Sequence, residues 1–264
     1  MKNYHCTEIL NLISENILKF DLEYLLGLYK CFEKKDYREI SIKKIHAPFY
    51  NYLSSTIVFN NRQFDLPYFL PYNGKEKCKG TLMLLGMDAK GQHGNDYTLL
   101  SSPYDIHGKS PKAEYVDYIN VLRTSYNIYL TDIFKAYWSE KDGKASNQNP
   151  NYIAESFHKK LLEKEIQILK KSKKMVGILT WGEQARNAIL DSYNIPINKN
   201  PSNPKGQISK ENLIPYKLTE KIKLIASTHP GKGNGHRNSY FRFNKLGEKW
   251  DSEIMANAVV KSLE

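Results

Sequence analysis

Thr81–Gly86 reads TLMLLG, a short continuous apolar run that ends in glycine. A strand that is apolar on both faces is typical of a sheet covered on both sides, as in parallel α/β sheets. Three further runs of this kind follow along the chain: Ile128–Thr131 (IYLT), Met175–Thr180 (MVGILT) and Ile222–Ser227 (IKLIAS). The four runs predict four buried strands.

Helical patterns separate and follow the predicted strands, at about 111–125, 151–173, 183–193 and 247–263. Strands that alternate with helices indicate an α/β fold whose sheet is largely parallel. We therefore expect residues 81–264 to form a three-layer α/β/α domain around a central, mostly parallel four-stranded sheet.

Residues 1–80 differ in character from this domain. Apolar residues recur at near-helical spacing over 8–32, which predicts one long helix or two short ones, with Asp21 and Gly27 as points where a helix could break. Prolines and an Asn-Gly-Lys turn over 40–80 indicate irregular structure. We expect this segment to be a helical and irregular extension that packs on the core.

The composition is that of an ordinary globular protein with an excess of positive charge. Hydrophobic residues make up 41% and charged residues 25% of the 264 residues, which argues against a disordered or fibrous chain. Lysine and arginine number 39 against 28 for aspartate and glutamate, so the net charge is +11. Such a charge is expected of a protein that binds DNA or another polyanion, but a lysine-rich composition without such a partner produces the same excess.

Few residues could hold a metal or a cofactor. Cys6, Cys31 and Cys78 are far apart and form no C-x-x-C pair, so neither a disulfide framework, nor a cysteine-only zinc site, nor an iron–sulfur cluster is expected. The seven histidines show no close pairing of ligand type, and the phosphate-loop, zinc-protease and serine-hydrolase motifs are absent. We expect no metal and no cofactor.

Nothing in the sequence predicts export or membrane insertion. No apolar run approaches the roughly 20 residues of a membrane span, and the first ten residues lack the apolar stretch of a signal peptide. We expect a monomeric cytoplasmic protein with reduced thiols and no membrane partner.

Ligands of parallel sheets bind beyond the carboxyl ends of the strands, so the residues just after each run are candidates for chemistry. In chain order these segments are Gly86–Gly91 (GMDAKG), Thr131–Lys135 (TDIFK), Trp181–Ala185 (WGEQA) and Ser227–Gly231 (STHPG). Each is a weak signal alone, but four in this order, each after a predicted strand, are far more specific.

This ordered set resembles the uracil-DNA glycosylase superfamily. The first motif of that family is a G-x-[DN]-P-like turn after the first core strand, and the last is H-P-[SG]. Between them lies a strand that ends in a base-reading asparagine, and several members open a helix with W-G-x-x-A. The resemblance covers about residues 81–240 and implies an enzyme that flips a base out of DNA and hydrolyses its N-glycosidic bond, which leaves an abasic site.

The chemistry of that reaction explains two of the residue types. Cleavage leaves an oxocarbenium-like sugar and puts negative charge on the departing base, so the site needs an anion near C1′ and a donor at the base. The resemblance assigns the first role to Asp88 and the second, a hydrogen bond to base O2, to His229. Each residue alone also fits a structural role, because Asp often caps helices and a histidine can be held by a following proline.

Asp132 stands where the family usually has the asparagine that reads uracil. A protonated carboxyl can accept from the N4 amino group of cytosine and donate to N3, and a carboxylate can pair with N3-protonated cytosine. Uracil would set its O4 acceptor against another acceptor, at a cost of about 1–3 kcal/mol. The alternatives are that Asp132 caps a turn or that the alignment slips by one residue.

The first motif departs from the family as well. Uracil-specific members follow the aspartate with Pro-Tyr, whose ring crowds C5 of the base, whereas Ala89, Lys90 and Gly91 stand here. The site therefore has room for a large group at C5 of the base, and Lys90 could hydrogen-bond a polar group at that position. The other residues expected around the base are Gly86, Met87 and, as the stacking aromatic, Tyr97.

A glycine-rich basic segment follows His229 and is expected to contact DNA phosphates as the base is flipped. The residues expected to contact DNA are Lys232, His236, Arg237, Tyr240 and Arg242, together with Lys135. No apolar wedge follows the H-P-G motif, so Arg237 or Tyr240 could fill the gap that the flipped base leaves.

These departures favour a DNA glycosylase for a cytosine-type base with a bulky C5 group, such as the glucosylated hydroxymethylcytosine of some phage DNA. Such an enzyme would serve in defence against phage. Two alternatives stay open: a uracil-DNA glycosylase of base-excision repair, and a catalytically silent member that acts by binding DNA.

Overall fold

The computed structural model describes the greater part of the chain. Described are residues 7–33, 38–40, 44, 62–88, 98–101, 113–134, 157–198, 201, 203–231 and 236–264. Only the backbone is described at residues 32, 33, 38–40, 62–65, 87, 88, 98–101, 134, 157 and 158. The chain divides into two compact units. Unit 1 is Met1–Phe69, Asp88–Pro111 and Thr131–Ser172, and unit 2 is Leu70–Met87, Lys112–Leu130 and Lys173–Glu264.

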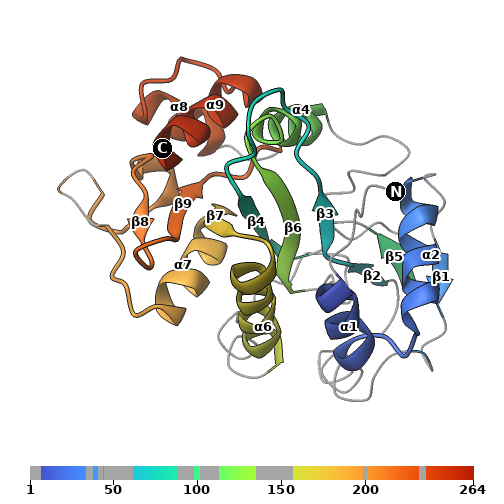
Figure 1. Ribbon diagram of the computed structural model, residues 1–264. Coiled ribbons are helices and arrows are strands. Elements are labelled where there is room, and N and C mark those ends of the chain that lie inside the picture. The colour runs from blue at the N-terminus through green and yellow to red at the C-terminus, as the bar shows by residue number, and fades with distance from the viewer. Residues whose placement is uncertain are drawn as a thin grey trace. The chain divides into compact units, whose positions relative to one another are not determined.

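Helices and strands alternate over much of the described chain (Figure 1). The helices are α1 (Thr7–Asn16), α2 (Leu22–Glu33), α4 (Ala113–Leu122), α6 (Phe157–Ser172), α7 (Glu183–Ser192), α8 (His236–Phe243) and α9 (Ser252–Leu263), with a 3-10 turn η3 (Ile208–Lys210). The strands are β1 (Arg38–Ile40), β2 (Arg62–Asp65), β3 (Tyr68–Leu70), β4 (Thr81–Asp88), β5 (Thr98–Ser101), β6 (Asn127–Phe134), β7 (Met175–Trp181), β8 (Tyr216–Lys217) and β9 (Lys223–Ser227). None of the helices in the described segments is long and apolar enough to cross a membrane.

The main sheet has six strands in the order β3-β6-β4-β7-β9-β8. Strand β7 pairs in parallel with both β4 and β9, whereas β8 pairs with β9 in antiparallel fashion. The expected α/β fold with a mostly parallel sheet is therefore confirmed. The four predicted strands are the four consecutive strands β6, β4, β7 and β9.

The sheet has two more strands than predicted, and both lie at its edges. Strand β3 has three residues directly after Pro67, and β8 has two residues directly after Pro215. Strands of two or three residues are too short to show an alternation of apolar and polar residues, and a preceding proline is typical of a loop. The hydrophobic pattern therefore gave no sign of either edge strand.

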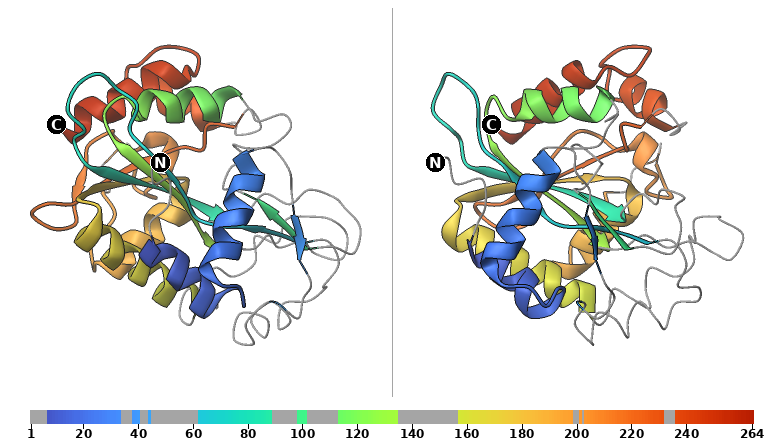
Figure 2. Two further views of the ribbon diagram at one scale, coloured as in Figure 1. Left: turned by 45° about the vertical axis from the view of Figure 1, so that its right-hand side comes forward. Right: turned by 90° about the vertical axis from the view of Figure 1, so that its right-hand side faces the viewer.

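Helices cover both sides of the strands in unit 2. Helices α4, α8 and α9 lie on one side and α7 on the other (Figures 1 and 2). Residues Leu82–Leu85 of β4 are fully buried between them, which explains the unbroken apolar run. Helix α9 packs closely on β7 at Gly177, where a Cβ would lie 3.2 Å from the Leu263 side chain.

In unit 1 the N-terminal pattern forms two helices rather than one. Asp21 separates them, because its carboxylate accepts from the backbone N–H of Tyr24 at 2.7 Å and starts α2. Helix α1 packs on both α2 and α6. Tyr29 of α2 is buried and donates its hydroxyl to the Pro67 carbonyl at 2.5 Å. The N-terminal helical extension is confirmed, and the domain boundary at residue 80 stays a prediction.

Candidate active site

Two glycine-containing turns follow neighbouring strands at one edge of the sheet in unit 2. Since β4, β7 and β9 are parallel, their carboxyl ends meet at that edge. Gly182, just after β7, has a φ of 103°, which favours glycine. Its N–H donates to the Ser227 carbonyl at 2.8 Å, so the ends of β7 and β9 are tied together. His229 begins the next turn, two residues beyond β9.

The backbone of that turn determines which ring nitrogen of a neutral His229 carries the proton. The N–H of Gly231 lies 3.3 Å from Nδ1 of His229. A backbone N–H can only donate, so Nδ1 acts as the acceptor, and in the neutral ring the proton sits on Nε2. A Cβ at Gly231 would lie 2.8 Å from the Tyr115 hydroxyl and 3.2 Å from Nδ1, so a side chain at this position would displace the tyrosine hydroxyl.

Two aromatic side chains surround the partly exposed His229 ring. The Tyr115 hydroxyl lies 3.0 Å from Nδ1 and 3.1 Å from Nε2, and the two rings meet edge to face at 77°. The Trp181 ring lies edge-on with its centroid 6.0 Å from that of His229. Trp181 is only 2% exposed, so water is excluded from this side of the imidazole. A hydrogen bond that Nε2–H donates here is stronger than the same bond in water.

Arg237 supports the same turn. Its Nη1 donates to the Pro230 carbonyl at 2.8 Å and lies 3.9 Å from a carboxylate oxygen of Glu114. Glu114 and Tyr115 are neighbours in the first turn of α4. One turn of helix therefore contacts the His229 turn through two adjacent side chains.

The other residues of the basic segment differ in accessibility. His236, at the start of α8, and Arg242, near its end, are exposed. Tyr240 is fully buried and donates to the Ala226 carbonyl at 2.7 Å. Since none of its surface is exposed in this conformation, we do not assign Tyr240 the role of filling the gap left by a flipped base.

Asp132 lies within β6 in unit 1 and is only 1% exposed. The strand runs three residues further than the apolar run, so Asp132 is not in a turn. Its neighbour Thr131 donates to the two carboxylate oxygens of Glu165 at 3.3 and 3.4 Å. Successive strand residues point to opposite faces, so the Asp132 carboxyl faces away from Glu165.

Several predicted site residues cannot be placed. Tyr97, Lys90, Lys135 and Lys232 lie outside the described residues. Asp88 is the last residue of β4 and Met87 precedes it, but the description covers only their backbone. Gly86 is buried in the same strand.

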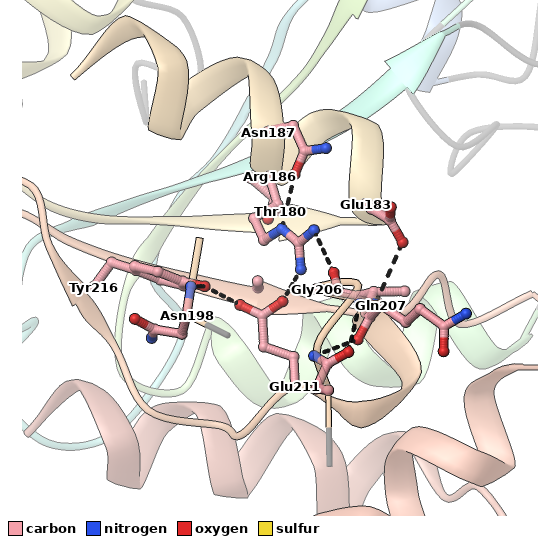
Figure 3. A network of polar contacts seen from close by, with 12 residues as sticks. Thr180, Glu183, Arg186, Asn187, Asn198, Gly206, Gln207, Glu211 and Tyr216 are labelled. Carbon is pink, nitrogen blue, oxygen red and sulfur yellow. Dashed lines mark hydrogen bonds and ion pairs between the residues drawn. The ribbon is translucent and has the colours of Figure 1, made fainter. Parts of the chain in front are cut away.

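A separate polar network is buried beneath α7 in unit 2 (Figure 3). Arg186, with no exposed surface, forms an ion pair with Glu211 and donates to the Gly206 carbonyl at 2.8 Å. The Tyr216 hydroxyl donates to the other carboxylate oxygen of Glu211 at 2.6 Å. Burial raises the pKa of Glu211, while the Tyr216 hydroxyl and the Arg186 charge act in the opposite direction.

This network extends to α8. The amide of Asn244, just after α8, donates to the Glu211 carbonyl at 3.0 Å and accepts from the Leu213 N–H at 2.6 Å. Helix α8 also packs on η3. The network therefore links α7, the segment before β8 and the helix that carries Arg237.

Sequence reasoning missed Glu114 and Tyr115. The pattern predicted their helix, but a glutamate and a tyrosine in a first helical turn carry no local signal of contact with residues more than 110 positions away. Among the described residues, no group of three or more His, Cys, Asp or Glu side chains is arranged to hold a metal ion.

Comparison with models of known protein families finds no match for this chain, and no curated protein matches it.

Proposed function

We propose that this protein is a DNA glycosylase that hydrolyses the bond between deoxyribose and a flipped-out base. The observation that supports the proposal is the His229 turn, where the Gly231 N–H on Nδ1 makes Nε2 the protonated nitrogen of the neutral ring in a partly exposed histidine. Its place just after β9, with Asp88 at the end of β4, matches the motif order of the uracil-DNA glycosylase superfamily. The three-layer α/β/α arrangement around β6, β4, β7 and β9 is part of the same proposal.

The proposed reaction breaks one bond and forms another. The bond from C1′ to the base nitrogen breaks with its electron pair on the base, and His229 Nε2–H donates to base O2 as negative charge develops there. The Asp88 carboxylate stabilises the sugar cation and orients a water molecule, which attacks C1′ and passes a proton to that carboxylate; the base anion takes up one proton from solvent, and Asp88 returns its proton to solvent. The products are a free base and an abasic site.

The proposed base is a cytosine with a bulky C5 group. A charged carboxylate is costly to bury, so the burial of Asp132 favours a protonated carboxyl, which accepts from N4 and donates to N3 of cytosine. Ala89, Lys90 and Gly91, directly after Asp88, include no aromatic side chain that would crowd C5. Glucosylated hydroxymethylcytosine in phage DNA fits both features, and a defence role would follow from it.

A base-panel assay tests this proposal. Duplexes and single strands carrying one uracil, cytosine, hydroxymethylcytosine or glucosylated hydroxymethylcytosine are incubated with the protein, and abasic sites are detected by alkaline cleavage. We expect the glucosylated base to be released fastest. Release of uracil alone would indicate a repair enzyme, and binding without release of any base would indicate a silent DNA-binding protein.

The substitution Asp132→Asn tests whether this side chain selects the base through its hydrogen bonds. We expect the variant to gain relative activity on uracil by about tenfold to a hundredfold, because an amide satisfies both O4 and N3–H. The matched control is Glu165→Gln, a buried carboxyl on the other face of β6, which should leave the base preference unchanged. An unchanged preference in a folded Asp132→Asn variant would show that Asp132 does not read the base.

A further inference from the structure

We infer that Tyr115 is a positioning residue for His229. The kinetic part of this inference rests on the proposed glycosylase function, but the geometric part does not. The evidence lies in three features of unit 2: the location of the Tyr115 hydroxyl, the second contact of the same helical turn, and the contrast with Tyr118.

The Tyr115 hydroxyl contacts the imidazole of His229 without pointing at one particular ring nitrogen. It is almost equally far from the two ring nitrogens, at 3.0 and 3.1 Å. An in-plane hydrogen bond to one nitrogen would leave the other much farther away, and an oxygen in the ring plane this close to both would overlap Cε1, so the hydroxyl lies against the face of the ring. Rotation of the imidazole about its Cβ–Cγ bond would drive the ring into this oxygen. The hydroxyl therefore holds the orientation in which Nδ1 faces the Gly231 N–H.

Glu114, the residue before Tyr115 in α4, supports the same turn through Arg237. Arg237 bridges from the Glu114 carboxylate to the Pro230 carbonyl, and both charged side chains are only 17% exposed. Partial burial reduces screening by water, so this contact is stronger than an ion pair on an open surface. The first turn of α4 thus holds both the imidazole and the backbone that follows it. Arg237 contributes to the site by supporting the turn, whether or not it also contacts DNA.

Tyr118 provides an internal comparison one turn further along α4. Its ring packs edge to face on Trp181 with a centroid distance of 5.4 Å, and the Tyr115 ring packs on Trp181 at 5.5 Å with a tilt of 56°. The hydroxyl of Tyr118 is buried beside Trp181 and Ser227 and not against the imidazole. Removing one hydroxyl from each tyrosine therefore separates the contact with His229 from general packing against Trp181.

The experiment compares Tyr115→Phe with Tyr118→Phe in the full chain. Protein labelled with ¹⁵N-histidine is examined by NMR without DNA, and the imidazole signals of His229 are assigned by their loss in His229→Gln. Base release is then measured for kcat and KM on the best substrate of the panel, and thermal melting checks the fold.

We expect Tyr115→Phe to shift the ¹⁵N signals of His229 and to lower kcat about threefold to tenfold, with KM within about twofold of the parent protein. Tyr118→Phe should change neither. Unshifted His229 signals in Tyr115→Phe, or equal changes in both variants, would overturn the inference. If the parent protein releases no base, the proposed function fails, whereas the NMR comparison still decides whether Tyr115 orients His229.

Discussion

Replacing His229 with alanine is expected to slow base release by about a hundredfold to a thousandfold. In the proposed reaction the imidazole is the donor at the atom where negative charge develops, and loss of one such preorganised donor has an effect of this size. The rate is measured in single-turnover reactions at saturating protein, on DNA that carries the preferred base of the panel, so that binding and product release do not contribute.

Two measurements on the same variant keep this result specific to catalysis. DNA affinity should change by no more than a few fold, because the proposed mode of binding makes Nε2–H one contact among many, and the melting temperature should show a folded protein. A folded His229→Ala variant that releases base within threefold of the parent rate would remove His229 from the mechanism.

The second large effect is on stability. Glu211→Ala is expected to lower the free energy of unfolding by about 3–5 kcal/mol, because it leaves the buried Arg186 guanidinium without its counter-charge. The Tyr216 hydroxyl loses its acceptor in the same step. Urea denaturation followed by circular dichroism measures the change.

Two further variants test the reason for that loss. Lys79→Met breaks the exposed ion pair with Glu264 in the same unit and should leave the unfolding midpoint unchanged. The double variant Arg186→Met/Glu211→Ala should recover part of the stability, because no uncompensated charge stays buried. If Glu211→Ala moves the midpoint no more than Lys79→Met does, the network does not stabilise this unit.

The central strands were predictable because burial on both faces leaves a continuous apolar run. The runs beginning at Thr81 and Met175 start where β4 and β7 start. The closing helix was expected too early, at about 247, because Trp250 continues the helical spacing. Helix α9 begins only after Asp251, whose carboxylate accepts from the Ile254 N–H at 2.9 Å.

Contacts between distant residues were beyond the reach of local patterns. Arg186 follows the W-G-E-Q-A motif and reads as an exposed helix residue, yet it has no exposed surface and pairs with Glu211 across 25 positions. His229 was predicted as a site residue from its motif, but Tyr115, which contacts it, comes from a helix whose sequence carries no mark of that contact. The burial of Tyr240 was likewise not evident from its sequence, where it stands in a polar and basic segment.

The most direct measurement is the identity and amount of the products from DNA that contains glucosylated hydroxymethylcytosine. Mass spectrometry of the small-molecule fraction and an aldehyde-reactive probe on the DNA are applied to the same reaction. A DNA glycosylase yields free glucosylated base and abasic sites in equal amounts, with both lost in Asp88→Asn. Strand breaks without free base, or no release of any base from the whole panel, would contradict the proposed function.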